Sequence, residues 1–338
     1  MTAHHLSPQL LTLLRMISFM RPHGSIADDA FRKRYLRNLP GATIDAYRNI
    51  HVRVGQSRVL WSSHTDTVHW ESGIQRVVIA GGRVCLPAGS QSTCLGADDT
   101  VGVWLMREMI LARVPGHYVF HYGEESGGIG SSKLAARQAA FLERKFDAAI
   151  ALDRGGCADI ITHQTGQRCC SDTFAYSLAA QLGTGFEPSS HGVYTDTAEY
   201  VDSIPECTNV SIGYTMQHTS FESVSLAHVF ALRTALLGFD ETALVIEREP
   251  GTIEYDDWNV QSWEDIWKDK PAVTGLVWDS ETCGWVDKTS KPALAEYVTE
   301  DEDEDERDSY KYLDPQYAEV QRALRNGTLH LLNNHKKG

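Results

Sequence analysis

The stretch YVFHYGEESGGIGSSKLAARQAAFLERKFDAAIALDRGG, at residues 118–156, decides the predicted fold. Its apolar runs at 118–120 and 148–152 predict two buried strands, and the amphipathic spacing at 131–146 predicts a helix between them. Alternation of strand and helix is typical of α/β proteins, in which helices cover both faces of a largely parallel sheet. We therefore expect a three-layer α/β/α fold with a mixed, mostly parallel central sheet.

The same alternation continues on both sides of this stretch. Further strands are predicted at 50–54, 58–62 and 209–213, a hairpin at 77–86 around Gly81-Gly82, and helices at 100–114, 171–182, 197–201 and 224–239. The apolar run from Leu10 to Met20 lacks a basic flank and a small-residue cleavage site. We therefore expect a helix docked on the core rather than a signal peptide.

The composition is that of a globular protein and argues against several kinds of partner. Of the 338 residues, 42% are hydrophobic, and no run approaches the roughly 18 apolar residues that a membrane-spanning helix needs. The net charge of −14 argues against binding to nucleic acid or to an anionic membrane surface. The seven cysteines form no CxxC pair and no tight framework, which favours reduced thiols and a cytoplasmic location.

The character of the sequence changes after Glu249. Residues 251–338 hold 20 of the 45 acidic and 10 of the 31 basic side chains, so most of the excess negative charge lies there. Five of the eight tryptophans precede an acidic run at 300–308, and a helical pattern follows at 315–332. We expect a catalytic domain at 1–249 and an extension at 250–338, whose tryptophan-rich part packs on the domain or on a protein partner.

Two clusters of polar residues stand near the ends of predicted elements in the first half of the chain. His64 and Asp66 follow the strand at 58–62, and residues two apart on an extended chain face the same way, so Asp66 can support the imidazole. Asp98 and Asp99 precede the helix at 100–114. Taken alone, the first pair is also expected by chance, and the second pair is also typical of a helix N-cap.

Three more clusters follow predicted strands. Glu124 and Glu125 come after the strand at 118–120, Asp153 ends the strand at 148–152, and His218 follows the strand at 209–213. Solvated loop carboxylates and a structural histidine are the ordinary interpretations of such residues. Open α/β sheets, however, bind ligands at the carboxyl ends of their strands, where Asp153 would meet the pairs Asp98-Asp99 and Glu124-Glu125.

Taken together, the five clusters resemble the co-catalytic di-zinc exopeptidases. This superfamily contains the single-domain zinc aminopeptidases, peptidase T, the acylase and carboxypeptidase relatives and the glutaminyl cyclases. The matching stretches are SHTD at 63–66, LGADDTVG at 95–102, YGEESGGIGS at 122–131, ALDRGG at 151–156 and HT at 218–219. The resemblance covers residues 60–220 and, with the flanking helices, 1–245; the segment beyond Glu249 has no counterpart in it.

The resemblance implies a role for each matching residue. His64 and Asp153 would bind one Zn²⁺, Glu125 and His218 the other, and Asp98 would bridge the two, with other divalent ions as alternatives to zinc. Asp66 would support His64 from behind. Glu124 would be the general base acting on a metal-bridging water. The peptide bond between Asp98 and Asp99 is expected to be cis.

Spacing and a local match favour the single-domain aminopeptidase branch. Asp153 and His218 are 65 positions apart, which leaves no room for the inserted lid domain of the carboxypeptidase and peptidase T branches. The segment TDTAEY at 195–200, followed by Ile204-Pro205, is similar to the S-D-H-x-x-F…G-I-P segment of this branch, with Thr197 in the place of the histidine. By the same resemblance, Tyr194 would stabilise the oxyanion, with His191 as the rival candidate.

The resemblance therefore implies a metal-dependent hydrolase of terminal peptide or amide bonds, with a zinc aminopeptidase as our first choice. An N-acyl amino-acid amidohydrolase or a carboxypeptidase is the alternative, because Arg154 or Arg168 is suited to hold a substrate carboxylate. A glutaminyl-cyclase-like acyltransferase comes next. A non-catalytic protein that binds a partner through its extension is the alternative from another class, although such a protein should have lost some of the metal ligands.

Overall fold

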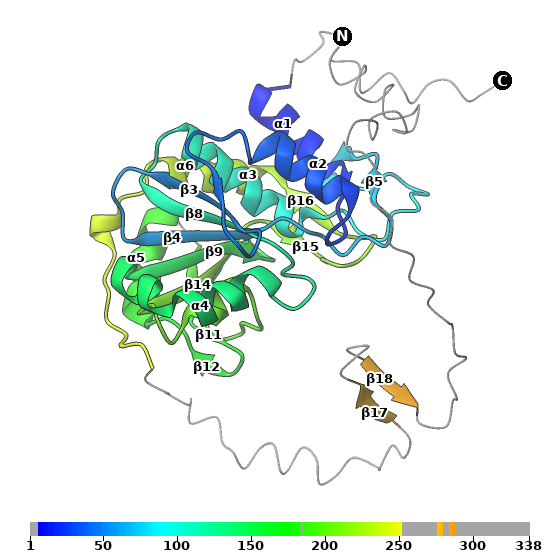
Figure 1. The fold of residues 1–338 in the computed structure, drawn as a ribbon. Helices are drawn as coiled ribbons and strands as arrows, with labels where there is room; N and C mark the ends of the chain where they lie inside the picture. Colours follow the sequence, from blue (N-terminus) through cyan, green and yellow to red (C-terminus); the bar gives the residue numbers. More distant parts are fainter. Residues whose placement is uncertain (1–5, 184, 252–275, 280–283, 288–338) are drawn as a thin grey trace, which may run out of the picture. The chain divides into compact units, whose positions relative to one another are not determined.

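The computed structural model describes residues 6–183 and 185–251 and two short strands beyond them (Figure 1). The chain divides into two units, Met1–Tyr255 and Asp256–Gly338. In the second unit, β17 (Leu276–Asp279) pairs antiparallel with β18 (Gly284–Asp287). The predicted packing of the tryptophan-rich stretch, the acidic run at 300–308 and the helix at 315–332 lie outside the described residues. The predicted domain boundary at 249 stays a prediction.

An eight-stranded sheet forms the centre of the first unit. Its strands lie in the order β13 (Glu187–Ser189), β10 (Asp159–Ile161), β14 (Glu206–Ser211), β9 (Ala148–Arg154), β4 (Val59–His64), β8 (Gly116–His121), β3 (Ile50–Val54) and β2 (Thr43–Ile44). The four middle strands, from β14 to β8, are parallel, whereas β10 and β3 run antiparallel to their inner neighbours. This arrangement confirms the predicted mixed, mostly parallel sheet.

Helices cover both faces of this sheet (Figure 1). On one face, α3 (Ala97–Leu111) packs on β4 and β9 and contacts α1 (Pro8–Ile17) and α6 (Leu226–Leu237), which in turn contacts α5 (Asp172–Leu182). On the other face, the 3₁₀ helix η1 (Asp196–Tyr200) contacts β4, β9 and β14, and α4 (Ile129–Lys145) packs on η1. The predicted three-layer α/β/α architecture is therefore confirmed.

A second, four-stranded sheet joins distant parts of the chain beside the first. It consists of β15 (Tyr214–Thr215), β16 (Ser223–Ser225), β7 (Arg83–Cys85) and β6 (Val78–Ala80), all antiparallel. The turn between β6 and β7 is Gly81-Gly82, and both glycines have positive φ, as the predicted hairpin requires. Because β16 pairs with β7, this sheet fixes the segment that carries His218. In the described part of the chain, the segments between the site residues form strands and helices of this one unit, with no inserted lid domain.

Small elements complete the first unit. They are α2 (Ile26–Tyr35), the strand pairs β1 (Phe19–Met20) with β5 (Gly73–Ile74) and β11 (His163–Gln164) with β12 (Gln167–Arg168), and the 3₁₀ helix η2 (Glu241–Ala243). The helix predicted at 197–201 is the 3₁₀ helix η1, shifted by one residue. A serine side chain caps the N-terminus of α1, α2, α5 and α6. The cap residues of α3 and α4 are instead Gly96 and Gly128, both in the left-handed conformation.

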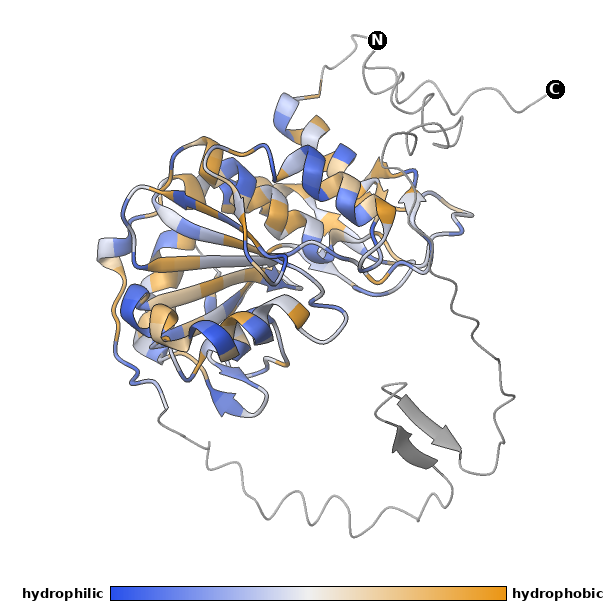
Figure 2. Cartoon of the chain, in the orientation of Figure 1, coloured by the Kyte–Doolittle hydropathy of each residue, from blue (hydrophilic) through white to orange (hydrophobic). Residues whose placement is uncertain are grey.

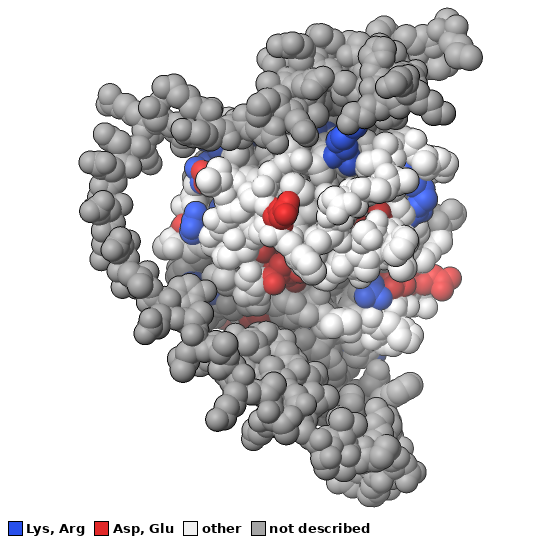
Figure 3. All heavy atoms as spheres, turned by 90° about the vertical axis from the view of Figure 1, so that its right-hand side faces the viewer, with Lys and Arg blue, Asp and Glu red and all other residues white. Residues whose placement is uncertain are grey.

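The hydrophobic residues of the first unit form one core around the central sheet (Figure 2). Its largest members include Trp61 and Trp104, both fully buried. Cys169 and Cys170 are also buried in this core, and all six described cysteines are free. None of the described helices combines the length and apolar character needed to cross a membrane. Charged side chains are few and scattered over the described surface of the face drawn in Figure 3.

Candidate metal centre

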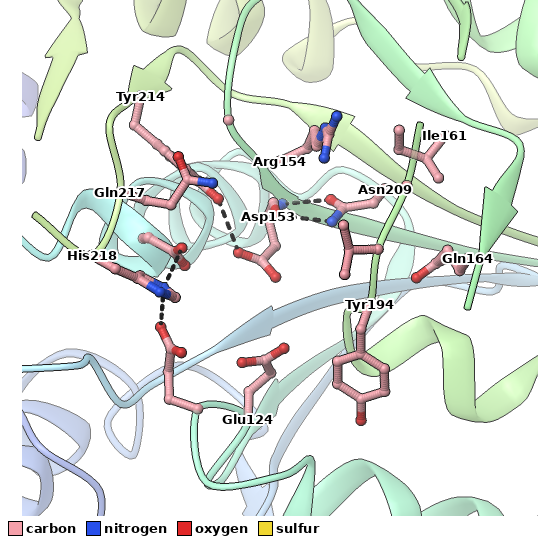
Figure 4. A pocket seen from close by; sticks show the side chains of 15 residues that line it. Glu124, Asp153, Arg154, Ile161, Gln164, Tyr194, Asn209, Tyr214, Gln217 and His218 are labelled. Atoms are coloured by element: carbon pink, nitrogen blue, oxygen red, sulfur yellow. Dashed lines mark hydrogen bonds and ion pairs between the residues drawn. The ribbon is translucent and has the colours of Figure 1, made fainter. Parts of the chain in front are cut away.

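Six of the eight predicted site residues line one cavity of about 280 Å³, and His64 and Asp66 are buried behind its wall. The cavity is lined by Asp98, Glu124, Glu125, Asp153, Arg154, Gly155, Ile161, Gln164, Gly192, Val193, Tyr194, Asn209, Tyr214, Gln217 and His218. Figure 4 shows Asp153, Glu124 and His218 pointing toward one another from three different segments. Asp153 lies near the carboxyl end of β9, and His64 ends the neighbouring strand β4. The cavity therefore opens where an α/β sheet commonly binds its ligands.

The first group of possible ligands surrounds His64. Its Nε2 atom lies 3.1 Å from Oδ1 of Asp98 and 3.5 Å from Oδ1 of Asp153. Thr195 Oγ1 donates a hydrogen bond of 2.7 Å to the other oxygen of Asp153 and so fixes the carboxylate. The structure thus brings together the three residues that the resemblance assigns to one metal ion.

The second group lies on the other side of Asp98. His218 Nε2 is 3.2 Å from Oδ2 of Asp98 and 3.0 Å from Oε1 of Glu125. The two oxygens of Asp98 therefore face different histidines, as a bridging carboxylate requires. One ligand atom each from His64, Asp98 and Glu125 lies within 4.8 Å of the others. This set takes residues from both predicted groups, which share Asp98.

Asp98 and Asp99 are joined by a cis peptide bond, as the resemblance implies. The carboxylate of Asp99 also lies within 4.8 Å of ligand atoms of His64 and Asp153. Its two oxygens, however, accept the backbone N–H groups of His64 and Gly102, each at 3.1 Å. The N-cap interpretation is therefore wrong, because the cap residue of α3 is Gly96, although Asp99 does accept a backbone N–H group three residues ahead, and Asp98 faces the cavity.

Asp66 positions two elements of the site. His64 Nδ1 lies 3.1 Å from the backbone oxygen of Asp66 and 3.6 Å from its carboxylate, so the closer support of the imidazole comes from the main chain. The Asp66 carboxylate instead accepts the backbone N–H groups of Glu124 and Glu125, each at 3.2 Å. The two glutamates are thereby fixed relative to the strand that carries His64.

The electrostatics of the site reflect an excess of buried negative charge. Burial and the neighbouring Asp98 raise the pKa of Asp153 to about 6. Burial also raises the pKa values of Glu124 and Glu125. Hydrogen bonds to Asp98 and Glu125 raise the pKa of His218 to about 10. Carboxylates gathered in this way are the environment that a divalent cation stabilises.

Tyr194 lines the cavity, but its hydroxyl group has another partner. It donates a hydrogen bond of 2.9 Å to Oε1 of Glu199, and Figure 4 shows the hydroxyl turned away from Asp153. The predicted role of Tyr194 at the oxyanion stays a prediction. His191, the rival candidate, is exposed and does not line the cavity.

Several contacts of the site involve residues that the sequence analysis missed. Tyr214 donates a hydrogen bond of 3.4 Å to Asp153, and Asn209 exchanges two hydrogen bonds with the Asp153 backbone. Glu222 accepts the backbone N–H group of Asp98. Asn209 lies near the end of β14, and Tyr214 comes shortly after that strand. Their position near a strand end could therefore have identified both as site residues. Glu222 acts on main-chain groups and left no such signal.

No family model and no curated protein matches the chain, but solved structures do. The tripeptidase of Staphylococcus aureus subsp. aureus Mu50 has a TM-score of 0.55 at 15% identity, with 68% of this chain and 96% of that chain covered. Aminopeptidase PepT of Bacillus cereus ATCC 10987 has a TM-score of 0.51 at 14% identity over the same shares. The TET1 peptidase of Pyrococcus horikoshii has a TM-score of 0.51 at 17% identity, with 69% and 99% covered.

The alignments span nearly the whole length of these peptidases and about two thirds of this chain. At such low identity, the likeness concerns the fold. The fold that the site motifs imply is therefore confirmed independently of those motifs: the chain has the fold of the TET, PepT and tripeptidase structures.

Proposed function

We propose that the protein is a metal-dependent hydrolase that removes the N-terminal residue of peptides, with two Zn²⁺ ions as the expected cofactor. The observation that carries the proposal is the cavity in which Asp98 faces both His64 and His218, with Glu124 beside them. Together with Asp153, this arrangement unites residues from five separate segments of the chain. A protein that had lost its catalytic role would have no reason to keep all of them in place.

The residues of the cavity fit a pair of divalent ions. Imidazole nitrogens together with carboxylate oxygens are the donors that zinc takes at catalytic sites. His64, Asp98 and Asp153 would hold one ion, and Asp98, Glu125 and His218 the other. The raised pKa values of Asp153 and Glu125 show that burial and neighbouring charge disfavour their ionised forms, so bound cations would stabilise them. When bound, such ions lower the pKa of water and polarise a scissile carbonyl group.

Glu124 is placed to move the proton in this reaction. Its Oε2 atom lies 4.0 Å from His64 Nε2, and its side chain lines the cavity. Because burial raises its pKa, the carboxylate is a better base than an exposed glutamate. Glu124 would accept a proton from the attacking water and return it to the leaving amine, while Asp66 holds its backbone.

The charges around the cavity favour a substrate with a free amine. Arg154 lines the cavity but is paired with Asp159 at 3.0 Å, and Arg168 is paired with Asp172 at 3.0 Å. Both candidates for a carboxylate clamp are therefore already neutralised by a neighbour. All four carboxylates that line the cavity are assigned to the metal ions or to proton transfer, so the preference for a free amine rests on the pairing of these two arginines. An N-acyl amino-acid amidohydrolase or a carboxypeptidase is the second candidate, because Arg154 lies at the cavity wall.

A substrate panel tests the proposal directly. Protein loaded with zinc would be given aminoacyl 4-nitroanilides, short peptides with free ends, the same peptides with an acetylated N-terminus, and N-acetyl amino acids. We expect cleavage of the first two groups, loss of cleavage on acetylation, and loss on metal removal. Cleavage of the N-acetyl amino acids alone would favour the second candidate. Turnover of none of them would contradict a hydrolase of terminal bonds.

A further inference from the structure

Glu222 lies four residues after His218, at the end of the loop that joins β15 to β16. The neighbouring Phe221 is 77% exposed, whereas Glu222 is 1% exposed. A carboxylate is withdrawn from water only where other donors replace its hydration. The groups that donate hydrogen bonds to Glu222 therefore indicate which part of the protein its carboxylate stabilises.

Three backbone N–H groups donate to Glu222, and all belong to residues just before α3 or in its first turn. Oε2 accepts those of Leu95 and Gly96, each at 2.9 Å, and Oε1 accepts that of Asp98 at 3.1 Å. Gly96 is the cap residue of α3 and has no side chain to satisfy these groups. A carboxylate 126 positions further along the chain satisfies them instead.

The main chain of Glu222 closes the turn that carries His218. Its N–H group donates to the backbone oxygen of Thr219 at 3.1 Å, and Thr219 Oγ1 donates to the backbone oxygen of Met216 at 2.7 Å. The side chain of His218 itself is 48% exposed, so little packing holds it. One residue thus fixes the segment of Asp98 through its side chain and the loop of His218 through its backbone.

We propose that Glu222 is the positioning residue for the metal-binding group of Asp98, Glu125 and His218. Glu222 would hold Asp98 and His218 at their present separation before an ion arrives. The loops then lose less conformational freedom when the ion binds. The inference rests on the proposed function, because it concerns the second ion of the same site. It assigns to Glu222 no contact with substrate.

Glu222→Gln is the informative substitution because it keeps the shape of the side chain. One of the two oxygens becomes an NH₂ group, which cannot accept from the backbone N–H groups that face it. We expect the affinity for the ion held by His218 to fall roughly 10–100-fold, the range typical of lost outer contacts. The ion held by His64 and Asp153 should be affected less, since only Asp98 is common to both groups.

Glu206 offers a matched control in the same chain. It is fully buried, and its carboxylate accepts the backbone N–H groups of Ser171, Glu247 and Arg248 at 2.7–2.9 Å. It stands at the first residue of β14, whereas the site lies near the carboxyl end of the parallel strand β9. Glu206→Gln should therefore lower stability without changing metal affinity.

The experiment is a competition titration of metal-stripped protein with Zn²⁺ and a fluorescent chelator, which yields the affinity of each bound ion. Wild type, Glu222→Gln, Glu206→Gln and His218→Ala would be compared, the last identifying the ion of the second group. Thermal unfolding of the metal-stripped proteins would report stability. Glu222→Asp, which keeps the charge and both acceptors, should bind the second ion with intermediate affinity.

The inference is supported if Glu222→Gln binds more weakly the same ion that His218→Ala loses, while Glu206→Gln binds both ions as wild type does. Two ions bound by Glu222→Gln with wild-type affinities would overturn it. If Glu222→Gln does not fold, Glu222→Asp decides, and wild-type affinities in that variant would overturn the inference. Failure of wild type to bind any Zn²⁺ is a different result, because it would remove the proposed function itself.

Discussion

The backbone N–H group of Glu124 donates to Oδ1 of Asp66, with the two atoms 3.2 Å apart. The other oxygen of the same carboxylate accepts the N–H group of Glu125. Asp66 follows the strand that carries His64, so this single side chain fixes the positions of the two glutamates relative to the histidine. The proposed base and a proposed metal ligand therefore share one support, which acts on their backbone N–H groups.

Replacing Asp66 with asparagine should impair this support. The amide keeps one acceptor but presents NH₂ to the second backbone N–H group. We expect kcat to fall about 10–100-fold, with a smaller change in KM. Steady-state kinetics on an aminoacyl 4-nitroanilide would measure both. Asp45→Asn is the control, because Asp45 accepts two backbone N–H groups away from the cavity; an equal loss in that variant would contradict the assignment.

Glu124 and Glu125 are neighbours with different assigned roles, which makes them a matched pair. Glu124→Gln should lower kcat about 10²–10⁴-fold, because the group that moves the proton is lost, and should leave the bound metal unchanged. Glu125→Gln should lose one ion. Metal content and kcat measured on both variants separate the roles. Loss of metal from Glu124→Gln, with none from Glu125→Gln, would exchange the two assignments.

His117 provides a pH-dependent stability that is independent of the site. Burial lowers its pKa to about 3, so between pH 6.5 and 3 the unfolded chain binds a proton that the folded chain does not. Stability is therefore lost as the pH falls below 6.5, by about 2 kcal/mol between pH 7 and 5. Urea unfolding of His117→Gln should show a shallower loss over this range. Identical slopes for wild type and variant would refute the prediction.

The sequence predicted the central strands and the main helices because their hydrophobic patterns are strong. The strands at 118–120 and 148–152 and the helix at 131–146 correspond to β8, β9 and α4, with small shifts at their ends. Strands β10 and β13 were not predicted. They are only three residues long, and pairing at the sheet edge, rather than their own pattern, makes them strands.

The candidate ligands could be predicted because each lies in a short sequence motif. The residues that hold those ligands in place could not, because they act on distant segments of the chain. His64, Asp98 and Asp153 each stand at the end of an element and carry side chains suited to metal. Glu222 and Asp66 act on backbone N–H groups of remote segments, at separations that no short motif records. Tyr194 binds Glu199, only five positions away, but this contact depends on the shape of the chain before η1, which no motif records.

The central claim is that Asp98 joins two metal-binding groups in one cavity. Plasma mass spectrometry of the purified protein, wild type beside Asp98→Ala, tests it most directly. The account predicts about two zinc ions per wild-type chain and a sharp fall in the variant, with both proteins folded by circular dichroism. A wild-type protein that holds no metal and gains no thermal stability when zinc is added would contradict it.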